Sequence, residues 1–143
     1  MYHVIVTEAD EEEYEALGEK LIEESIARGA PDYLPDNKYF QIYVDDKLVG
    51  EAITTELRGS VELDLIFVEM EYRKRGIGKA LLESVENYAK NIGAAGVKIW
   101  TSSWEDAEFY NQFEYNEVVK IPLKTNGCFE GQQQFEQLFY KAF

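Results

Sequence analysis

The 143-residue sequence is poor in the residues that build disulfide-held or metal-held folds. It contains one cysteine, Cys128, and one histidine, His3. A single cysteine excludes a disulfide framework and an all-cysteine metal site, and a single histidine argues against a His-rich zinc site or a Ser-His or Cys-His triad. The three prolines and ten glycines exclude collagen-like and low-complexity classes. We therefore expect no metal ion in this protein.

Long apolar runs are missing as well. No segment approaches the roughly 18 consecutive apolar residues of a membrane span. The first six residues lack the basic region of a secretory signal, and acidic residues begin at Glu8. We therefore expect a cytoplasmic protein that does not enter a membrane.

Positive charge is scarce, and its distribution is uneven. The chain has 14 basic and 28 acidic residues, a net charge of −14, so most of its surface repels nucleic acid and anionic lipid. Nine of the 28 acids lie between Glu8 and Glu24, which is typical of a solvated helix face. Four of the 14 basic residues lie between Arg73 and Lys79, a stretch without acids that contains two glycines. This stretch is a candidate site for an anion.

What the chain does contain indicates a folded protein. Hydrophobic residues make up 45% and aromatic residues 14%, too many for a disordered chain. At about 100–200 residues per domain, the length predicts one domain, residues 1–143. Periodicity predicts the order β-α-β-β-β-α-β-α-β-β, an α/β (α+β) protein with helices on its sheet. Strands are expected at 2–6, 39–44, 48–57, 61–68, 97–100, 115–123 and 133–143. Helices are expected after a capping box at Asp10 and Glu13, over 78–92, and from Ser102 or Ser103 to about 113.

The stretch from Val68 to Lys79 carries the most chemistry. A strand, a short loop, two glycines and a helix follow one another, and the first N–H groups of a helix attract anions. A Rossmann fingerprint would need a third glycine where Leu81 stands, and a P-loop would need Ser or Thr after Lys79, where Ala80 stands. Both nucleotide motifs therefore fail.

At these residues the chain resembles the GCN5-related N-acetyltransferases (GNAT), along essentially its whole length. The family's pyrophosphate motif, Gln/Arg-x-x-Gly-x-Gly/Ala, stands as Arg73-Lys-Arg-Gly-Ile-Gly78. The later pattern Ala-x-x-Phe-Tyr-x-x-x-Gly-Phe is matched in part: Phe109-Tyr110 stand at its Phe-Tyr, Glu114-Tyr115 replace its Gly-Phe, and Ala107 stands two residues before Phe109 instead of three. The resemblance implies one mixed sheet of about seven strands, about four helices on both faces, and splayed central parallel strands that end near Val68 and Trp100.

The resemblance also implies acetyl-CoA as co-substrate. Its pantetheine arm would pair with the backbone of Phe67 and Val68, and its pyrophosphate would lie on the amides that begin the helix. The family's Asn that contacts pantetheine is Trp104 here, and Ser103 is a candidate replacement. The full set of expected cofactor-binding residues is Phe67, Val68, Arg73, Lys74, Arg75, Gly76, Ile77, Gly78, Lys79 and Ser103.

Three catalytic roles follow from the same resemblance. Tyr110 stands at the position of the general acid, and the alternative is a packed aromatic on an amphipathic helix. Glu62 stands at the position of the base in the histone-lysine branch, although it is also a polar strand end, and Asp64 shares its strand face by alternation. The backbone N–H of Val68 would stabilise the oxyanion. His3 is expected to be structural, and Cys128 is not expected to act as a nucleophile.

The sequence leaves the acceptor open. The leading hypothesis is a small-molecule primary amine, bound by the loops Gly29 to Lys38 and Lys124 to Gly131. A protein N-terminus or lysine is the alternative, and a non-catalytic acyl-CoA-binding module is a third hypothesis, prompted by the large ring of Trp104. The aromatic C-terminal strand is compatible with a homodimer interface and equally with the core.

Overall fold

The computed structural model describes residues 1–31, 34–124 and 131–143. The chain divides into two compact units, residues 1–33 and 34–143. The single domain expected from the length stays a prediction. Among the described residues, no helix is both long and apolar enough to cross a lipid bilayer.

The first unit consists of an irregular N-terminus and helix α1 (Glu11–Ala27). The predicted capping box is confirmed: the Glu13 amide donates to the Asp10 side chain at 2.8 Å, and the Asp10 amide donates to the Glu13 carboxylate at 3.0 Å. The predicted strand at 2–6 is wrong, because residues 1–10 have no regular secondary structure. Alternation gives these residues a preference for extended backbone, but a strand also needs a neighbour that satisfies its N–H and C=O groups.

The second unit is a mixed sheet with helices against it. Six strands are described, in the order β1-β2-β3-β4-β6-β5, and only β3 and β4 are parallel neighbours. This is one strand fewer than expected, since residues 2–6 form none, and three α-helices are described where about four were expected. The elements are β1 (Asp36–Val44), β2 (Lys47–Leu57), β3 (Ser60–Val68), the 3₁₀ turn η1 (Met70–Tyr72), α2 (Ile77–Asn91), β4 (Gly96–Ser102), α3 (Ala107–Asn111), β5 (Asn116–Leu123) and β6 (Gln134–Ala142).

Tight turns join the first three strands as predicted. Asp45 and Asp46 both have positive φ, 47° and 64°, and so do Arg58 and Gly59, 52° and 79°. Two successive residues with positive φ make the type of two-residue turn whose twist matches that of paired strands. The two hairpins place β1, β2 and β3 side by side.

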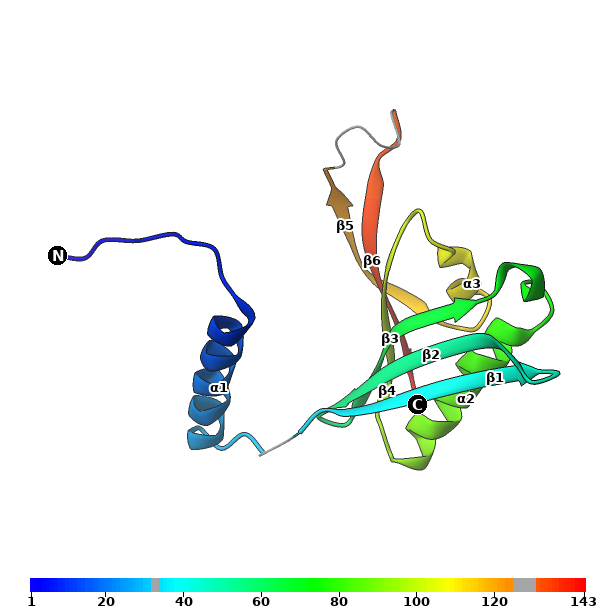
Figure 1. The fold of residues 1–143 in the computed structure, drawn as a ribbon, viewed down its shortest axis with the longest axis horizontal. Coiled ribbons are helices and arrows are strands. Elements are labelled where there is room, and N and C mark those ends of the chain that lie inside the picture. Colours follow the sequence, from blue (N-terminus) through cyan, green and yellow to red (C-terminus); the bar gives the residue numbers. More distant parts are fainter. Residues whose placement is uncertain (32–33, 125–130) are drawn as a thin grey trace. The chain divides into compact units, whose positions relative to one another are not determined.

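The two central parallel strands separate soon after they pair, as predicted. Their described pairing consists of two positions, Val61↔Val97 and Glu62↔Lys98. The register of β2 with β3 then shifts, so that Ile53 faces Leu65 while Thr54 faces Leu63, which leaves Asp64 as a bulge. A bulge bends its strand and increases its twist, and Figure 1 shows the β5–β6 arm leading away from β1–β3. The gap between β3 and β4 therefore opens beyond Glu62.

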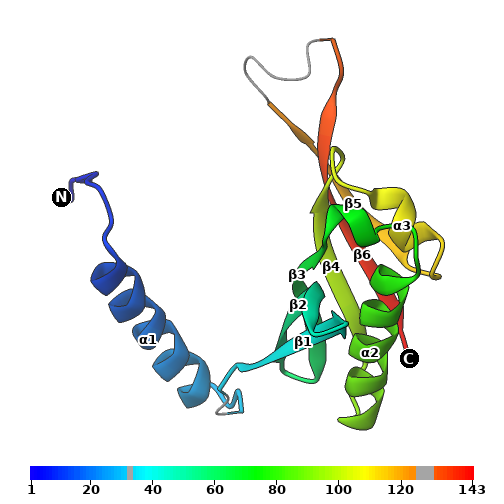
Figure 2. The ribbon, with the colours of Figure 1, turned by 45° about the vertical axis from the view of Figure 1, so that its right-hand side comes forward.

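The core lies between the sheet and helices α2 and α3, which cover the same side of it (Figure 2). Helix α2 has apolar side chains at helical spacing, and burial of each Leu or Val stabilises the fold by about 1.5–3 kcal/mol. The helix ends before Gly93, whose φ is 74°. The core residues that join α2 to the sheet are Leu81, Leu82, Val85, Ala89, Val61, Leu63, Val97, Ile99 and Phe139.

Helix α3 begins later than predicted. Its N-cap is Asp106, whose carboxylate accepts from the Phe109 amide at 3.2 Å, and not Ser102 or Ser103. Ser102 is the last residue of β4, and Ser103 is bonded to β6. A serine followed by a helical pattern resembles an N-cap, but here both serines form hydrogen bonds or strand structure in the sheet.

Candidate active site

The basic segment forms the start of helix α2, as predicted. Gly76 is the N-cap, with left-handed backbone at φ 85°, and the first intrahelical bond runs from the Ala80 amide to the Gly76 carbonyl. The amides of Ile77, Gly78 and Lys79 therefore have no acceptor within the helix. Together with the helix dipole and the nearby cations, these amides form a candidate site for an anion.

The two glycines of this segment are needed for different reasons. The space beside the Gly76 Cα is open, because a Cβ there would meet nothing within 4 Å. The positive φ of Gly76 also favours glycine. A Cβ at Gly78 would lie 3.2 Å from the ring of Phe109 on α3. Gly78 thus brings α2 and α3 close together, while Gly76 turns the chain and leaves room for a ligand.

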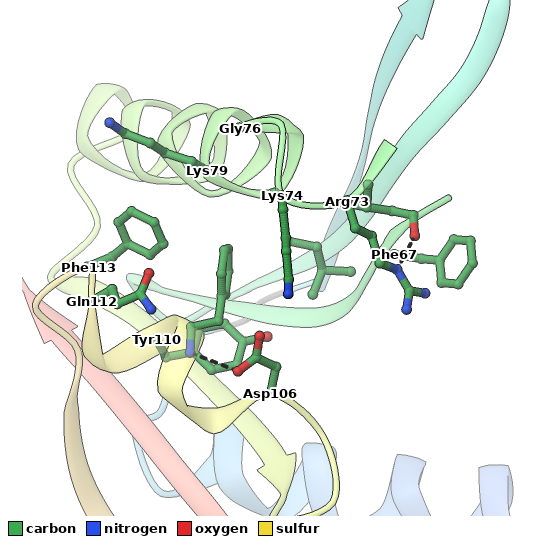
Figure 3. Close-up of a pocket in the computed structure, with 13 residues that line it drawn as sticks. Phe67, Arg73, Lys74, Gly76, Lys79, Asp106, Tyr110, Gln112 and Phe113 are labelled. Atoms are coloured by element: carbon green, nitrogen blue, oxygen red, sulfur yellow. Dashed lines mark hydrogen bonds between the residues drawn. The ribbon is translucent and has the colours of Figure 1, made fainter. Parts of the chain in front are cut away.

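A cavity of about 790 Å³ opens beside this helix start (Figure 3). Of the residues predicted to bind a cofactor or act in catalysis, eight line it: Phe67, Val68, Arg73, Lys74, Gly76, Gly78, Lys79 and Tyr110. Figure 3 shows Lys74 extending from the loop toward the α3 side, where Asp106 and Tyr110 lie. The cavity therefore joins the anion site to the candidate acid.

Four predicted residues lie outside the cavity lining. The guanidinium of Arg75 stacks on Tyr72, 5.4 Å from the ring centroid. The Ile77 side chain points to the sheet at Gly50, so only its backbone faces the anion site. The Ser103 hydroxyl donates to Gln134 at 2.7 Å and accepts from the Phe135 amide at 2.8 Å, which ties it to β6. Glu62 is the fourth.

The backbone of Val68 faces the gap between the parallel strands. The next residue, Glu69, donates its amide to the Val49 carbonyl on β2 at 2.8 Å. Because hydrogen-bonding directions alternate along an antiparallel strand, the N–H and C=O of Val68 point away from β2, toward the gap, and those of Phe67 point toward β2. Arg73 donates its Nε to the Val68 carbonyl at 2.9 Å. The group of Val68 left for a ligand is therefore its N–H donor.

Arg73 thus braces the end of β3. Its guanidinium carbon also lies 5.5 Å from the centroid of the Phe67 ring, a favourable cation–π geometry. Figure 3 shows Arg73 beside Phe67 at the outer side of the cavity, apart from Lys74 and Lys79. Lys79 is oriented along its own helix and lies 3.8 Å from Glu83.

Tyr110 is the buried phenol of the cavity wall. It is 7% exposed and packs on Phe139, with ring centroids 5.7 Å apart. Burial, followed by the carboxylates of Glu105 and Asp106, raises the pKa of Tyr110 to about 12, because all three disfavour the phenolate. The phenol is therefore a proton donor that stays protonated at neutral pH.

Glu62 lies at the point where the parallel strands part. Its strand neighbours Val61 and Leu63 face α2, so alternation directs the Glu62 side chain to the opposite face of the sheet. Its carboxylate is 25% exposed and lies 3.6 Å from the Lys98 ammonium on β4. Asp64, in the bulge, accepts from the Thr55 hydroxyl at 2.5 Å. Both carboxylates are thus near the gap, and neither lines the cavity on the α3 side.

The sequence did not identify five further residues of the cavity: Ile66, Asp106, Phe109, Gln112 and Phe113. Four of them recur with Tyr110 at spacings of three and four residues, and this periodicity places them on one face of a short helix. This spacing is visible in the sequence, but it is equally typical of a helix face that packs against the core. Trp104 lies outside the lining and is 48% exposed.

The remaining residues and loops named in the sequence analysis are either absent from the described lining of the cavity or outside the described residues. His3 is exposed in the irregular N-terminus. Cys128, most of the loop Lys124 to Gly131, and residues 32–33 of the loop Gly29 to Lys38 lie outside the described residues. Within the described ranges, no group of three or more His, Cys, Asp or Glu side chains could hold a metal ion.

The chain is similar in sequence to known proteins. Residues 5–129 match the acetyltransferase (GNAT) domain family. An uncharacterized N-acetyltransferase from Methanocaldococcus jannaschii is 41% identical over 69 residues, 46% of this chain and 30% of that protein. The chain thus spans under a third of that relative.

Two solved structures share the fold. The crystal structure of an acetyltransferase from Bacillus cereus aligns over 100% of both chains with a TM-score of 0.82 and 20% identity. A Bacillus subtilis acetyltransferase in complex with CoA aligns over 96% of this chain and 95% of that chain, with a TM-score of 0.62 and 18% identity. At these identities the likeness is one of fold.

Proposed function

Because this chain belongs to the GNAT acetyltransferase family, we propose that it transfers the acetyl group of acetyl-CoA to the primary amine of a small molecule. The observation that carries the proposal is the gap between β3 and β4. Val68 and Tyr110 line the same cavity as the cationic start of helix α2, beside this gap, which supports the proposal. The CoA complex of the Bacillus subtilis relative supports acetyl-CoA as the occupant.

The residues from Arg73 to Lys79, called the cradle below, fit the diphosphate of this co-substrate. The unpaired amides of Ile77, Gly78 and Lys79 are donors, Gly76 leaves open space, and Lys74 and Lys79 supply positive charge. Arg73 would act through the end of β3 by its bond to Val68. Acetyl-CoA supplies the activated acyl group as a thioester.

Two residues would stabilise the negative charges that develop on the carbonyl oxygen and on the departing sulfur. The Val68 N–H points into the gap and would donate to the carbonyl oxygen, which gains negative charge during attack. Tyr110 would give its proton to the departing thiolate, whose ordinary pKa is about 8.5. A pKa of about 12 keeps the Tyr110 phenol protonated at neutral pH, so the proton is available, and the same rise makes the phenol a weaker acid than the thiol that it would protonate.

Glu62 would remove the proton of the amine. An alkylamine has a pKa of about 10.4 and must be neutral to attack, so a base accelerates the reaction. Glu62 lies beside the gap on the sheet face opposite α2 and is only 25% exposed. Asp64 is the alternative base, and a bridging water would let either carboxylate act at a distance.

Acetyl-CoA binding is tested first by thermal unfolding. A co-substrate at 100 times its dissociation constant stabilises the fold by about 2.7 kcal/mol, which for this length is a rise in Tm of about 5–10 °C. We expect this rise for the wild type and its loss in Gly78→Glu, which puts a carboxylate at the cradle. The matched control is Gly18→Glu on α1, where a Cβ meets nothing within 4 Å. No rise in the wild type contradicts acetyl-CoA binding.

The acceptor is tested by CoA release against a panel of small amines, lysine peptides and free N-terminal peptides. Turnover with small amines alone supports the proposal, and turnover with peptides alone supports the alternative of a protein acceptor. Acetyl-CoA binding without turnover on any amine would leave the non-catalytic module. Tyr110→Phe, measured on the same panel, separates enzymatic from spontaneous acetylation.

A further inference from the structure

The turn between β4 and α3 is held by one carboxylate. Glu105 accepts from the Thr101 hydroxyl and, at 3.3 Å, from the Ser102 amide. Its own amide donates to the Ser102 carbonyl, and its carbonyl accepts from the Ala107 amide, both at 2.9 Å. Glu105 thus connects the last residues of a sheet strand to the first residue of a helix.

The two partners of this contact differ in burial. Thr101 is 5% exposed and belongs to the core face of β4, whereas Glu105 is exposed. A hydrogen bond from a buried hydroxyl to an ionised acceptor is shorter and stronger than a neutral one. The exposed turn is therefore fastened to a rigid part of the sheet.

Helix α3 depends on such external support. It has five residues, Ala107–Asn111, too few to be stable alone. Asp106 caps its start, and the Tyr115 amide donates to the Tyr110 carbonyl at 3.3 Å near its end. The direction of Tyr110 into the cavity is consequently set by how the helix start is held against β4.

The negative charge of Glu105 also acts on Tyr110, because it disfavours the phenolate. Burial is the largest cause of the raised pKa of Tyr110, and Glu105 is the next, ahead of Asp106. The other ionisable groups around this phenol are Tyr115, with ring centroids 6.1 Å apart, and Lys74, Lys79 and Arg73 across the cavity.

We propose that Glu105 is a positioning residue of the active site: its bonds to Thr101 and Ser102 hold α3 so that Tyr110 presents its phenol to the cavity. This inference rests on the proposed function, since it takes Tyr110 as the acid. Glu105 itself acts only through Tyr110.

Steady-state kinetics test the role through Tyr110. We expect Glu105→Ala to lower kcat by about tenfold with little change in the KM for acetyl-CoA, since small misplacements of a catalytic group are costly. Glu105→Gln keeps an oxygen that accepts from Thr101 and should retain most of the activity. In a Tyr110→Phe background, Glu105→Ala should cause no further loss. The matched control is Glu108→Ala, an exposed carboxylate on the same helix.

Equal losses in Glu105→Gln and Glu105→Ala would overturn the proposal, and so would an additive loss on top of Tyr110→Phe. A loss that appears in KM instead of kcat would overturn it as well.

Amide hydrogen exchange tests whether Glu105 holds α3, and it needs no amine substrate. Glu105→Ala should speed exchange in the segment 107–113 by about tenfold or more, while Glu105→Gln and Glu108→Ala leave it unchanged, because only Ala removes the anchor of the helix start. Unchanged exchange in Glu105→Ala would overturn the positioning role. If the wild type turns over no amine, the proposed function fails, and the exchange comparison still decides whether Glu105 holds α3.

Discussion

The two ends of the cavity are built in different ways. At the cradle, a run of neighbouring residues from Arg73 to Lys79 supplies the charges, the turn and the free amides. At the acid end, Tyr110 packs on Phe139 of β6, far along the chain, and on the nearby Tyr115 before β5. The cradle is thus formed by local backbone, and the properties of the proposed acid, Tyr110, depend on tertiary packing. Substitutions should therefore affect binding at one end and chemistry or stability at the other.

The largest effect is expected at the acid. Tyr110→Phe removes the phenol proton and keeps the ring that packs on Phe139, so kcat should fall by about 10²- to 10⁴-fold, the usual range for a general acid. The dissociation constant of acetyl-CoA, measured by calorimetry, should change little. Equal losses in affinity and turnover would contradict a division of labour between the two ends.

Breaking the support of the acid end should cost stability. Lys141 on β6 lies 2.5 Å from the buried Glu86 of α2 and donates to the Phe113 carbonyl at 3.0 Å. Lys141→Met would leave a buried carboxylate without its partner, which typically costs about 3–5 kcal/mol. Urea unfolding should show this loss, and the double variant Glu86→Leu/Lys141→Met should recover most of it. A single variant as stable as the wild type would show that the pair contributes nothing.

The same substitution to alanine should have different effects at the two cradle glycines. Gly76→Ala forces a side chain into left-handed backbone, at a cost of about 1–2 kcal/mol, and fills space left for the ligand. Gly78→Ala improves helix propensity by about 1 kcal/mol but pushes on Phe109.

We therefore expect weaker acetyl-CoA binding in Gly76→Ala by about tenfold, which is 1.4 kcal/mol, and near-normal stability in Gly78→Ala. Phe109→Leu, combined with Gly78→Ala, should relieve the remaining crowding. If both single variants lose affinity and stability alike, the glycines do not have separate roles.

The smallest expected effect is an unchanged rate at alkaline pH. The acid must be protonated, and a group with a raised pKa loses its proton only as pH rises through that raised value, here about 12 for Tyr110. The kcat of the wild type at saturating amine should therefore stay level between about pH 8 and 10, whereas a phenol at its ordinary pKa of about 10 would be half ionised at the upper end. Stopped assays with an enzyme-free blank would measure this. A decline centred near pH 10 would show that Tyr110 is not buried during turnover.

Features that depend on residues adjacent in sequence could be predicted. The capping box at Asp10 and the turns at Asp45 and Gly59 are confirmed, because each depends on a few adjacent residues. Helix α2 begins within the glycine-containing basic segment, as predicted. The segment 2–6 has strand propensity, yet its pairing is a tertiary property, and the strand is absent. Ser103 has the residue type of a helix cap, but the sheet determines its partners.

The sequence by itself determined which residues could make a cationic helix start, since charge, glycine and spacing are written in consecutive positions. Only the tertiary structure decided the rest of the site. The bulge at Asp64 parts β3 from β4 and turns the Val68 N–H to an open gap. Burial against Phe139 and the neighbouring carboxylates raise the pKa of Tyr110. Desolvation and strand divergence depend on what surrounds a residue in space, and no local pattern records that.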